Sequence, residues 1–174
     1  VTLIETEEDA QNVEIINPNQ LAFATQTTLS VDDTNAILTI LKNRFPNIKG
    51  PTAEDICYAT TNRQGAVKSL AKICDCILVI GAKNSSNSLR LVEVAIASGV
   101  KNSFLIPNER TLNDFLNTYD PIQFPNIGLT AGASAPETLV QVLIKKLKTN
   151  FKVNQINHEV IKENITFNLP KILR

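Results

Sequence analysis

The chain has 174 residues, and its 17 Lys and Arg residues balance 17 Asp and Glu residues, so its formal net charge is zero. A broad nucleic-acid-binding surface needs a basic excess, so this balance argues against nucleic acid as a partner. Hydrophobic residues make up 43% of the chain, enough for a buried core, yet no apolar run approaches the roughly 20 residues of a membrane-spanning helix. We therefore expect a globular protein without a membrane as partner.

The first predicted elements lie before residue 50. The acidic residues 1–11 lack the basic start and apolar run of a signal peptide. The short apolar run at residues 21–25 predicts a strand. Ser30 is the candidate N-cap of the helix that follows, because acidic residues occupy its first turn, and Pro46 ends this helix.

A longer series of elements follows the Gly50-Pro51 turn. In chain order, the patterns predict a helix over 62–72, a strand over 76–81, a helix over 89–98, a strand over 102–106, a helix over 111–116, a strand over 126–130, a helix over 136–148 and a terminal strand over 164–169. Gly99 is the expected residue just beyond the helix over 89–98.

This alternation predicts an α/β fold in which helices flank parallel sheets. We expect a partial α/β unit over residues 1–49, a complete unit over 50–150 and a carboxy-terminal tail over 151–174.

Three predicted loops are rich in small hydroxyl and amide residues: 25–28, 84–88 and 131–135. Each precedes a helix, and a helix N-terminus offers free N–H groups and a partial positive charge that favour phosphate. Ser, Thr and Asn are also the usual helix caps, so any one of these loops could be a cap alone. The sequence therefore leaves two interpretations, a phosphate site built from neutral donors and simple capping.

The cysteines number three, an odd count that, without a secretion signal, favours a reducing compartment. Cys57 precedes a predicted helix, where a thiol can serve as metal ligand or nucleophile, although a core position is the alternative. Cys76 begins an apolar strand and is expected in the core, while Cys74 receives no role. The single His, His158, lies in the polar tail, which argues against a Ser–His–Asp triad.

Several ordered segments resemble one family. They are TQTTLSVDDT at 25–34, RFPNI at 44–48, DICYATTNRQ at 55–64, GAKNSSNS at 81–88 and TAGASAPE at 130–137. Together they resemble the 4-hydroxy-3-methylbut-2-enyl diphosphate reductase family, over most of the stretch from Leu21 to Leu147.

The resemblance implies three similar α/β units around a cavity that holds a 4Fe-4S cluster, with one Cys ligand from each unit. Cys57 matches one of those ligands, and Cys74 and Cys76 match none. Thr27 matches a Thr of the substrate pocket, and the residues that match diphosphate contacts are Ser85, Ser86, Asn87 and Ser134. Ser88 is assigned to helix capping.

The implied activity is reductive dehydroxylation of 4-hydroxy-3-methylbut-2-enyl diphosphate to isopentenyl and dimethylallyl diphosphate, the last step of the methylerythritol phosphate pathway. Ferredoxin or flavodoxin would donate the electrons, in a cytoplasm of bacterial type or, alternatively, a plastid. The family's other cluster cysteines, its active-site histidines and its proton-donating Glu have no counterpart in this sequence, so we expect a fragment that is inactive alone. The alternative is a non-enzymatic phosphate-binding α/β module or an inactive remnant of the reductase.

Overall fold

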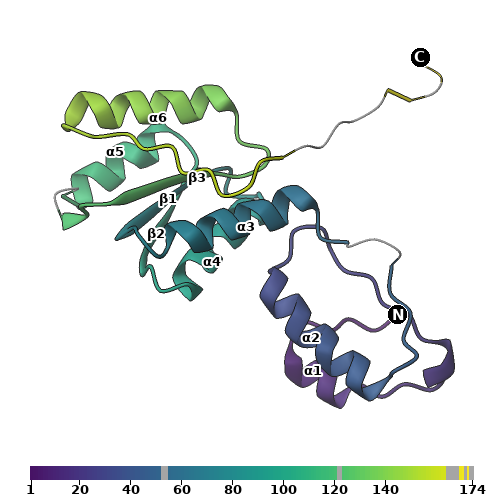
Figure 1. The fold of residues 1–174 in the computed structure, drawn as a ribbon. Coiled ribbons are helices and arrows are strands. Elements are labelled where there is room, and N and C mark those ends of the chain that lie inside the picture. The colour runs from purple at the N-terminus through teal and green to yellow at the C-terminus, as the bar shows by residue number, and fades with distance from the viewer. Residues whose placement is uncertain (52–54, 121–122, 164–168, 171, 173–174) are drawn as a thin grey trace.

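A parallel sheet of three strands organises the larger part of the chain (Figure 1). The computed structural model describes residues 1–51, 55–120, 123–163, 169–170 and 172. Its strands are β1 (Cys76–Ile80), β2 (Asn102–Ile106) and β3 (Ile127–Ala131), in the order β2-β1-β3. The helices are α1 (Glu7–Asn12), α2 (Val31–Arg44), α3 (Tyr58–Leu70), α4 (Ser86–Ala97), α5 (Glu109–Thr118) and α6 (Glu137–Asn150), with a short 3-10 helix over Pro18–Gln20.

The central strand β1 is buried along its whole length because helices cover both faces of the sheet. On one face Leu78 and Ile80 pack with Leu112 of α5 and Leu143 of α6. On the other face, Ile77 and Val79 of β1 pack against Val67 of α3 and Leu91 of α4. A run of apolar, largely β-branched residues suits a strand enclosed in this way. The expected α/β fold with parallel strands flanked by helices is therefore confirmed (Figure 1).

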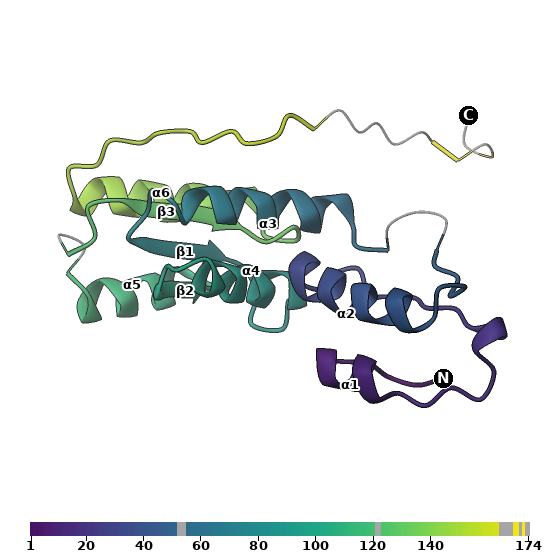
Figure 2. The ribbon, with the colours of Figure 1, turned by 60° about the horizontal axis from the view of Figure 1, so that its bottom comes forward.

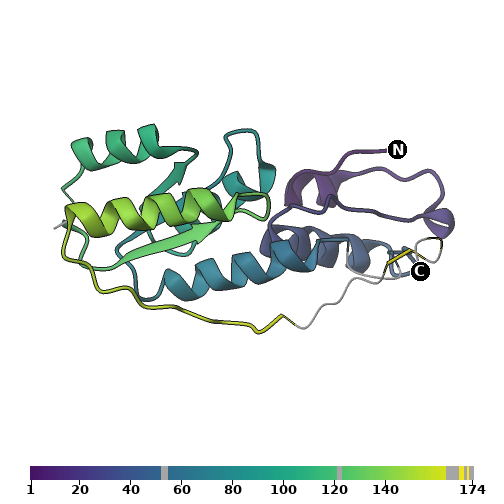
Figure 3. The same ribbon diagram turned by 90° about the horizontal axis from the view of Figure 1, so that it is seen from above.

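The amino-terminal part lies at one end of this sheet unit, beside the start of α3 (Figure 3). Helices α1 and α2 pack side by side there (Figure 2). Ser30 caps α2 as expected, since its hydroxyl accepts a hydrogen bond from the Asp33 N–H at 3.3 Å. Helix α1 was not expected from the sequence, although Thr6 and Asp9 form a reciprocal capping box at its start.

The strand predicted over residues 21–25 is wrong. Ala22 forms only an isolated parallel bridge with Lys49, with Lys49 N–H donating to Leu21 O and Phe23 N–H donating to Lys49 O, both at 2.9 Å. A strand is defined by a ladder of such bonds, and in the described part of the chain no further segment extends this ladder.

Three helices begin earlier than their apolar periodicity indicated. Helix α3 starts at Tyr58 rather than at 62, α4 at Ser86 rather than at 89, and α5 at Glu109 rather than at 111. The missed residues of α4 and α5 are polar and carry no hydrophobic period, so part of the predicted loop 84–88 is helix. The missed first turn of α3, residues 58–61, is mixed in polarity. Gly99 has φ +103° and follows the end of α4 as expected.

Residues 151–163 run from the end of α6 past α3 (Figures 2 and 3). The Ser69 hydroxyl and His158 Nε2 lie 2.8 Å apart, and Asn62 Nδ2 donates to Glu163 Oε1 at 2.8 Å. The terminal strand predicted over 164–169 lies almost wholly outside the described residues. Among the helices described, none is long and apolar enough to cross a membrane.

Two glycines give opposite predictions for stability. A Cβ added at Gly132 would lie 2.1 Å from Ser88 Oγ, so Gly132→Ala should lower the free energy of unfolding by about 1–3 kcal/mol. A Cβ at Gly65, inside α3, meets no atom within 4 Å, so Gly65→Ala should raise it by about 0.5–1 kcal/mol. Urea denaturation of both variants measures the two effects.

The control removes the atom that causes the clash. In a Ser88→Ala background the nearest atom to the new side chain is the Cβ of residue 88, at 3.3 Å. Gly132→Ala should then cost much less, and an equal cost in both backgrounds would show that the close approach to Ser88 is not the cause.

Candidate functional site

The candidate site lies where β1 and β3 end side by side. The chain leaves β1 through α4 to reach β2 on one side, and later returns through α5 to β3 on the other side, so the strand order reverses between β1 and β3. In open α/β sheets ligands bind at the carboxyl ends of strands at such a switch point. Ile80 pairs with Ala131 there, and Gly132 N–H donates to Ile80 O at 2.8 Å.

The first turn of α4 packs against the ends of these two strands. The Ser85 hydroxyl accepts a hydrogen bond from the Ser88 N–H at 3.3 Å and so caps the helix. The assignment of the cap to Ser88 is therefore wrong, because the side chain that binds the free N–H belongs to Ser85. Ser88 is fully buried, and its own hydroxyl donates to Ser85 Oγ at 3.0 Å.

Two glycines make room for this turn. A Cβ at Gly81, directly after β1, would lie 2.0 Å from Ser88 Oγ, and a Cβ at Gly132, directly after β3, would lie 2.1 Å from the same atom. A side chain at either position would force Ser88 or the first turn of α4 to shift. Sequence analysis gave Gly81 only the role of ending a strand and gave Gly132 none, since nothing in a single sequence places the two beside each other.

Asn87 has a buried amide without a partner. Its side chain is 6% exposed, and neither Nδ2 nor Oδ1 has a hydrogen-bond partner within the described part of the chain. Nδ2 lies 3.6 Å from the position that a Cβ at Gly132 would take. An unpaired buried amide lowers the free energy of unfolding by about 1–3 kcal/mol, so a native fold that contains one needs a reason for it. A ligand that forms hydrogen bonds with the amide when it binds is one such reason. Ser86 and Ser134, the neighbouring residues expected to contact diphosphate, are exposed.

Thr27 and Cys57 lie together in a second group. The Cys57 N–H donates to Thr27 O at 3.1 Å, which joins the loop before α2 to the start of α3. Cys57 is the N-cap residue of α3, its side chain is exposed, and it makes no side-chain capping bond within the described residues. Its free, exposed thiol thus lies at the N-terminus of α3.

Two residues of α3 hold these groups in place, and sequence analysis assigned a role to neither. Gln64 is 1% exposed; its Nε2 donates to Leu29 O at 2.8 Å and its Oε1 accepts from Val31 N–H at 3.0 Å. One amide side chain thereby clamps the loop that carries Thr27. Arg63 donates from Nε to Ala131 O at 3.2 Å, which ties α3 to the end of β3. The Asn87 side chain has no hydrogen-bond partner within the described residues, so none joins it to the Thr27–Cys57 pair, whereas α3 bonds both to the Thr27 loop and to the end of β3.

The donor set for a metal is incomplete in this chain. No group of three or more His, Cys, Asp or Glu residues that could hold a metal ion occurs among the described residues. Cys57 fits one ligand position of the expected cluster, as a free thiol at a helix N-terminus, and the described chain supplies no second. Cys76 is fully buried in the core, as expected.

Burial also sets the chemistry of the other two thiols. It raises the pKa of Cys76 to about 12, with the charges of Cys74 and Asp75 adding to the effect. Burial likewise raises the pKa of Cys74, and Asp75 contributes. Both thiols therefore stay protonated where an ordinary thiol begins to ionise, which argues against a role as metal ligands.

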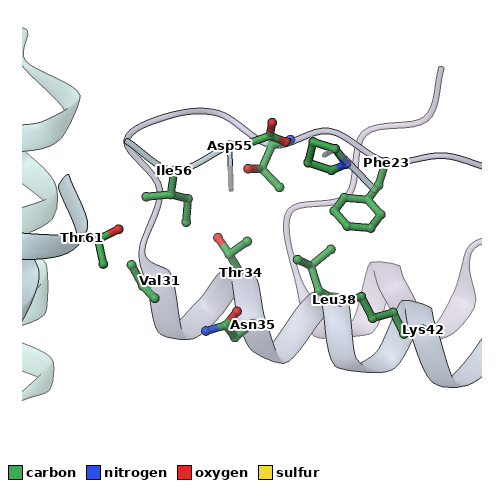
Figure 4. Close-up of a pocket in the computed structure, with 11 residues that line it drawn as sticks. Phe23, Val31, Thr34, Asn35, Leu38, Lys42, Asp55, Ile56 and Thr61 are labelled. Carbon is green, nitrogen blue, oxygen red and sulfur yellow. The ribbon is translucent and has the colours of Figure 1, made fainter. Parts of the chain in front are cut away.

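A cavity of about 400 Å³ lies between α2 and the segment before α3 (Figure 4). Val31, Thr34 and Leu38 of α2 face Asp55 and Ile56 across it. None of the residues expected to contact substrate or cluster lines this cavity, so it is separate from the candidate site at the ends of β1 and β3.

The environments of the three cysteines predict an order of reactivity. With a thiol reagent at mildly alkaline pH, Cys57 should react first because it is exposed, Cys74 more slowly, and Cys76 only after unfolding. Burial raises the pKa of Cys76 from 9.0 to about 12. The free energy of unfolding should therefore keep this contribution at pH values below 9.0 and lose it as the pH rises from 9.0 towards about 12. Mass spectrometry of peptides from the labelled protein measures the order, and early labelling of Cys76 would contradict it.

Comparison with known proteins adds independent evidence. The curated 4-hydroxy-3-methylbut-2-enyl diphosphate reductase 2 of Rhodopseudomonas palustris is 49% identical over 177 residues, covering all of this chain and 53% of the relative. The reductases of Methylococcus capsulatus and Ehrlichia ruminantium are 50% and 47% identical, covering all of this chain and 54% and 51% of their own length. The chain thus spans about half the length of the curated relatives it matches.

A solved structure agrees. The E-1-hydroxy-2-methyl-but-2-enyl-4-diphosphate reductase from Plasmodium falciparum matches with a TM-score of 0.85 and 32% identity, covering 98% of this chain and 52% of that one. The family model described as LytB protein matches residues 1–148. These matches confirm the resemblance carried by the motifs, and the chain belongs to the LytB protein family.

Proposed function

We propose that this chain carries the diphosphate-binding loops and one cluster ligand of an enzyme that reduces 4-hydroxy-3-methylbut-2-enyl diphosphate to isopentenyl and dimethylallyl diphosphate. The observation that carries the proposal is the buried, unpartnered amide of Asn87 at the switch point of the sheet. The names of the relatives indicate which diphosphate the site would take.

The candidate site, formed by the ends of β1 and β3 and the first turn of α4, suits an anion that is recognised by neutral donors. The N-terminus of α4 provides a partial positive charge, and Asn87 Nδ2 is a donor without a partner. The exposed hydroxyl of Ser86 lies on the first turn of α4, and that of Ser134 lies in the loop after β3. Both segments belong to the candidate site. A diphosphate has several acceptor oxygens, so it can satisfy several such donors at once.

Binding the diphosphate would also position the reacting carbon chain. Interactions with a part of the substrate that does not react supply binding energy that orients the part that does. Thr27 is exposed and its carbonyl accepts a hydrogen bond from the Cys57 N–H, and we assign it to the pocket for the carbon chain.

Cys57 would hold iron through its thiolate as one ligand of a 4Fe-4S cluster, with the remaining ligands from outside this chain. When bound, the cluster supplies electrons and a Lewis acid for removal of the allylic hydroxyl group. Ferredoxin or flavodoxin as electron donor, and a cytoplasmic location, rest on the family resemblance alone and remain part of the proposal.

The proposal predicts that Asn87→Ala separates affinity from stability. Pyrophosphate affinity should fall about ten- to hundredfold, because one hydrogen bond to a charged group is lost. The melting temperature should not fall, because the substitution removes a buried amide that has no partner in the free chain. Calorimetric titration of the 174-residue chain with inorganic pyrophosphate and thermal melting measure the two effects.

Two further variants sharpen this test. Asn87→Asp keeps the shape but puts a carboxylate against the anion, so binding should be weaker still. Asn43→Ala, an exposed Asn on α2, is the matched control and should leave affinity unchanged. Unchanged affinity in both Asn87 variants would remove the observation on which the proposal depends.

A second prediction concerns the metal ligand. In a protein extended to the length of the relatives and reconstituted anaerobically, Cys57→Ser should lose most of its bound iron, whereas Cys74→Ala and Cys76→Ala should retain it. The physical reason is that only Cys57 presents an exposed thiol at a helix N-terminus. Iron analysis of the three variants provides the measurement, and full iron content in Cys57→Ser together with loss in Cys76→Ala would mean that the wrong thiol was chosen.

The alternative function is a phosphate-binding module without redox activity. It is favoured by the absence, in the described residues, of a complete metal-ligand group. The two experiments separate the alternatives, because a simple module would bind pyrophosphate through Asn87 yet hold no iron at any chain length.

A further inference from the structure

The hydroxyl of Ser88 is enclosed by backbone. Ser88 is 0% exposed, and the Cα atoms of Gly81 and Gly132 approach so closely that a Cβ on either would overlap its Oγ. A buried hydroxyl proton must find an acceptor, because leaving it unpaired is costly. Within the described residues, the acceptor for Ser88 Oγ–H is Ser85 Oγ, at 3.0 Å.

This bond determines what Ser85 can do. A serine oxygen has two lone pairs and one proton. Ser85 Oγ accepts from the Ser88 N–H at 3.3 Å and from the Ser88 hydroxyl at 3.0 Å, so both lone pairs are occupied. Its own proton has no acceptor in the described part of the chain, and it must point away from Ser88. Unlike Ser88, Ser85 is partly exposed, so that proton is accessible to a ligand at the start of α4.

We propose that Ser88 is a positioning residue that fixes Ser85 as a hydrogen-bond donor to the diphosphate. The inference rests on the proposed function, because it adds Ser85, expected from the sequence to contact diphosphate, to the donors of that site. A free serine hydroxyl rotates and presents either a lone pair or a proton to a ligand, and a lone pair repels an anionic oxygen. Ser88 removes the unfavourable orientation before the ligand arrives, which lowers the cost of ordering on binding.

The arrangement also explains the two glycines. Only a backbone without side chains on both sides leaves a slot in which Ser88 Oγ can lie beside Ser85 Oγ while remaining out of contact with water. The role of Ser88 is thus distinct from that of Asn87, which we place in direct contact with the ligand.

A double-mutant cycle on the 174-residue chain tests the inference, with inorganic pyrophosphate as the probe. Ser88→Ala should weaken binding about three- to tenfold, as expected for weakening one hydrogen bond. Ser85→Ala should weaken it at least as much. The double variant should bind no more weakly than Ser85→Ala alone, because Ser88 acts only through the Ser85 hydroxyl. Ser98→Ala, at the far end of α4, should have no effect.

Each outcome separates the inference from the function on which it rests. An unchanged affinity in Ser88→Ala, or an equal further loss when Ser88→Ala is added to Ser85→Ala, would overturn the inference and leave the proposed function standing. A purely structural role for Ser88 predicts that equal loss in both backgrounds. If the unsubstituted chain binds no pyrophosphate, the proposed function fails and the inference fails with it.

Folding is checked by thermal melting of every variant. Should Ser88→Ala prove unfolded, the cycle is repeated in a Gly65→Ala background, which is expected to stabilise the chain. A Ser88→Ala variant that folds in that background and keeps full affinity would also overturn the inference.

Discussion

The close packing of α4's first turn against Gly81 and Gly132 is the constraint on which the rest of the site depends. Because neither glycine has a side chain, Ser88 lies in direct contact with the ends of two adjacent strands. This contact places the N-terminus of α4, with the buried Asn87, at the point where the strand order reverses. A helix held slightly further away would leave its N-terminus and the Asn87 amide in water, where neither would distinguish a ligand.

Helix α3 connects the ends of these strands to the second group of residues, Thr27 and Cys57. Its first residue follows Cys57, its buried Gln64 clamps the loop of Thr27, and Arg63 bonds to the end of β3 at Ala131. The Arg63 guanidinium also donates to a carbonyl of its own helix at Ala59. With a net charge of zero, the chain as a whole gives an anion no overall attraction, so recognition at the site depends on local groups.

The sequence predicted best where one local pattern decides the structure. Strand β2 has the expected bounds and β1 lies within its expected range, because a short apolar run between turn residues has few alternatives. The starts of α4 and α5 were missed because these helices begin with polar residues. The strand over residues 21–25 was wrong because an apolar run becomes a strand only where a partner extends the ladder, and the described chain offers Lys49 alone.

The sequence by itself determined the family, the α/β class, the loops that border the site and the cysteine at a helix start. These follow from motif identity and from the local chemistry of caps, turns and apolar runs. Only the tertiary structure decided that Gly81 and Gly132 lie beside each other, that Asn87 is buried without a partner and that Gln64 holds the Thr27 loop. The physical reason is that burial and hydrogen-bond satisfaction depend on groups that are distant in sequence. Gly81 and Gly132 meet at Ser88 through the order of the strands, which local composition does not encode.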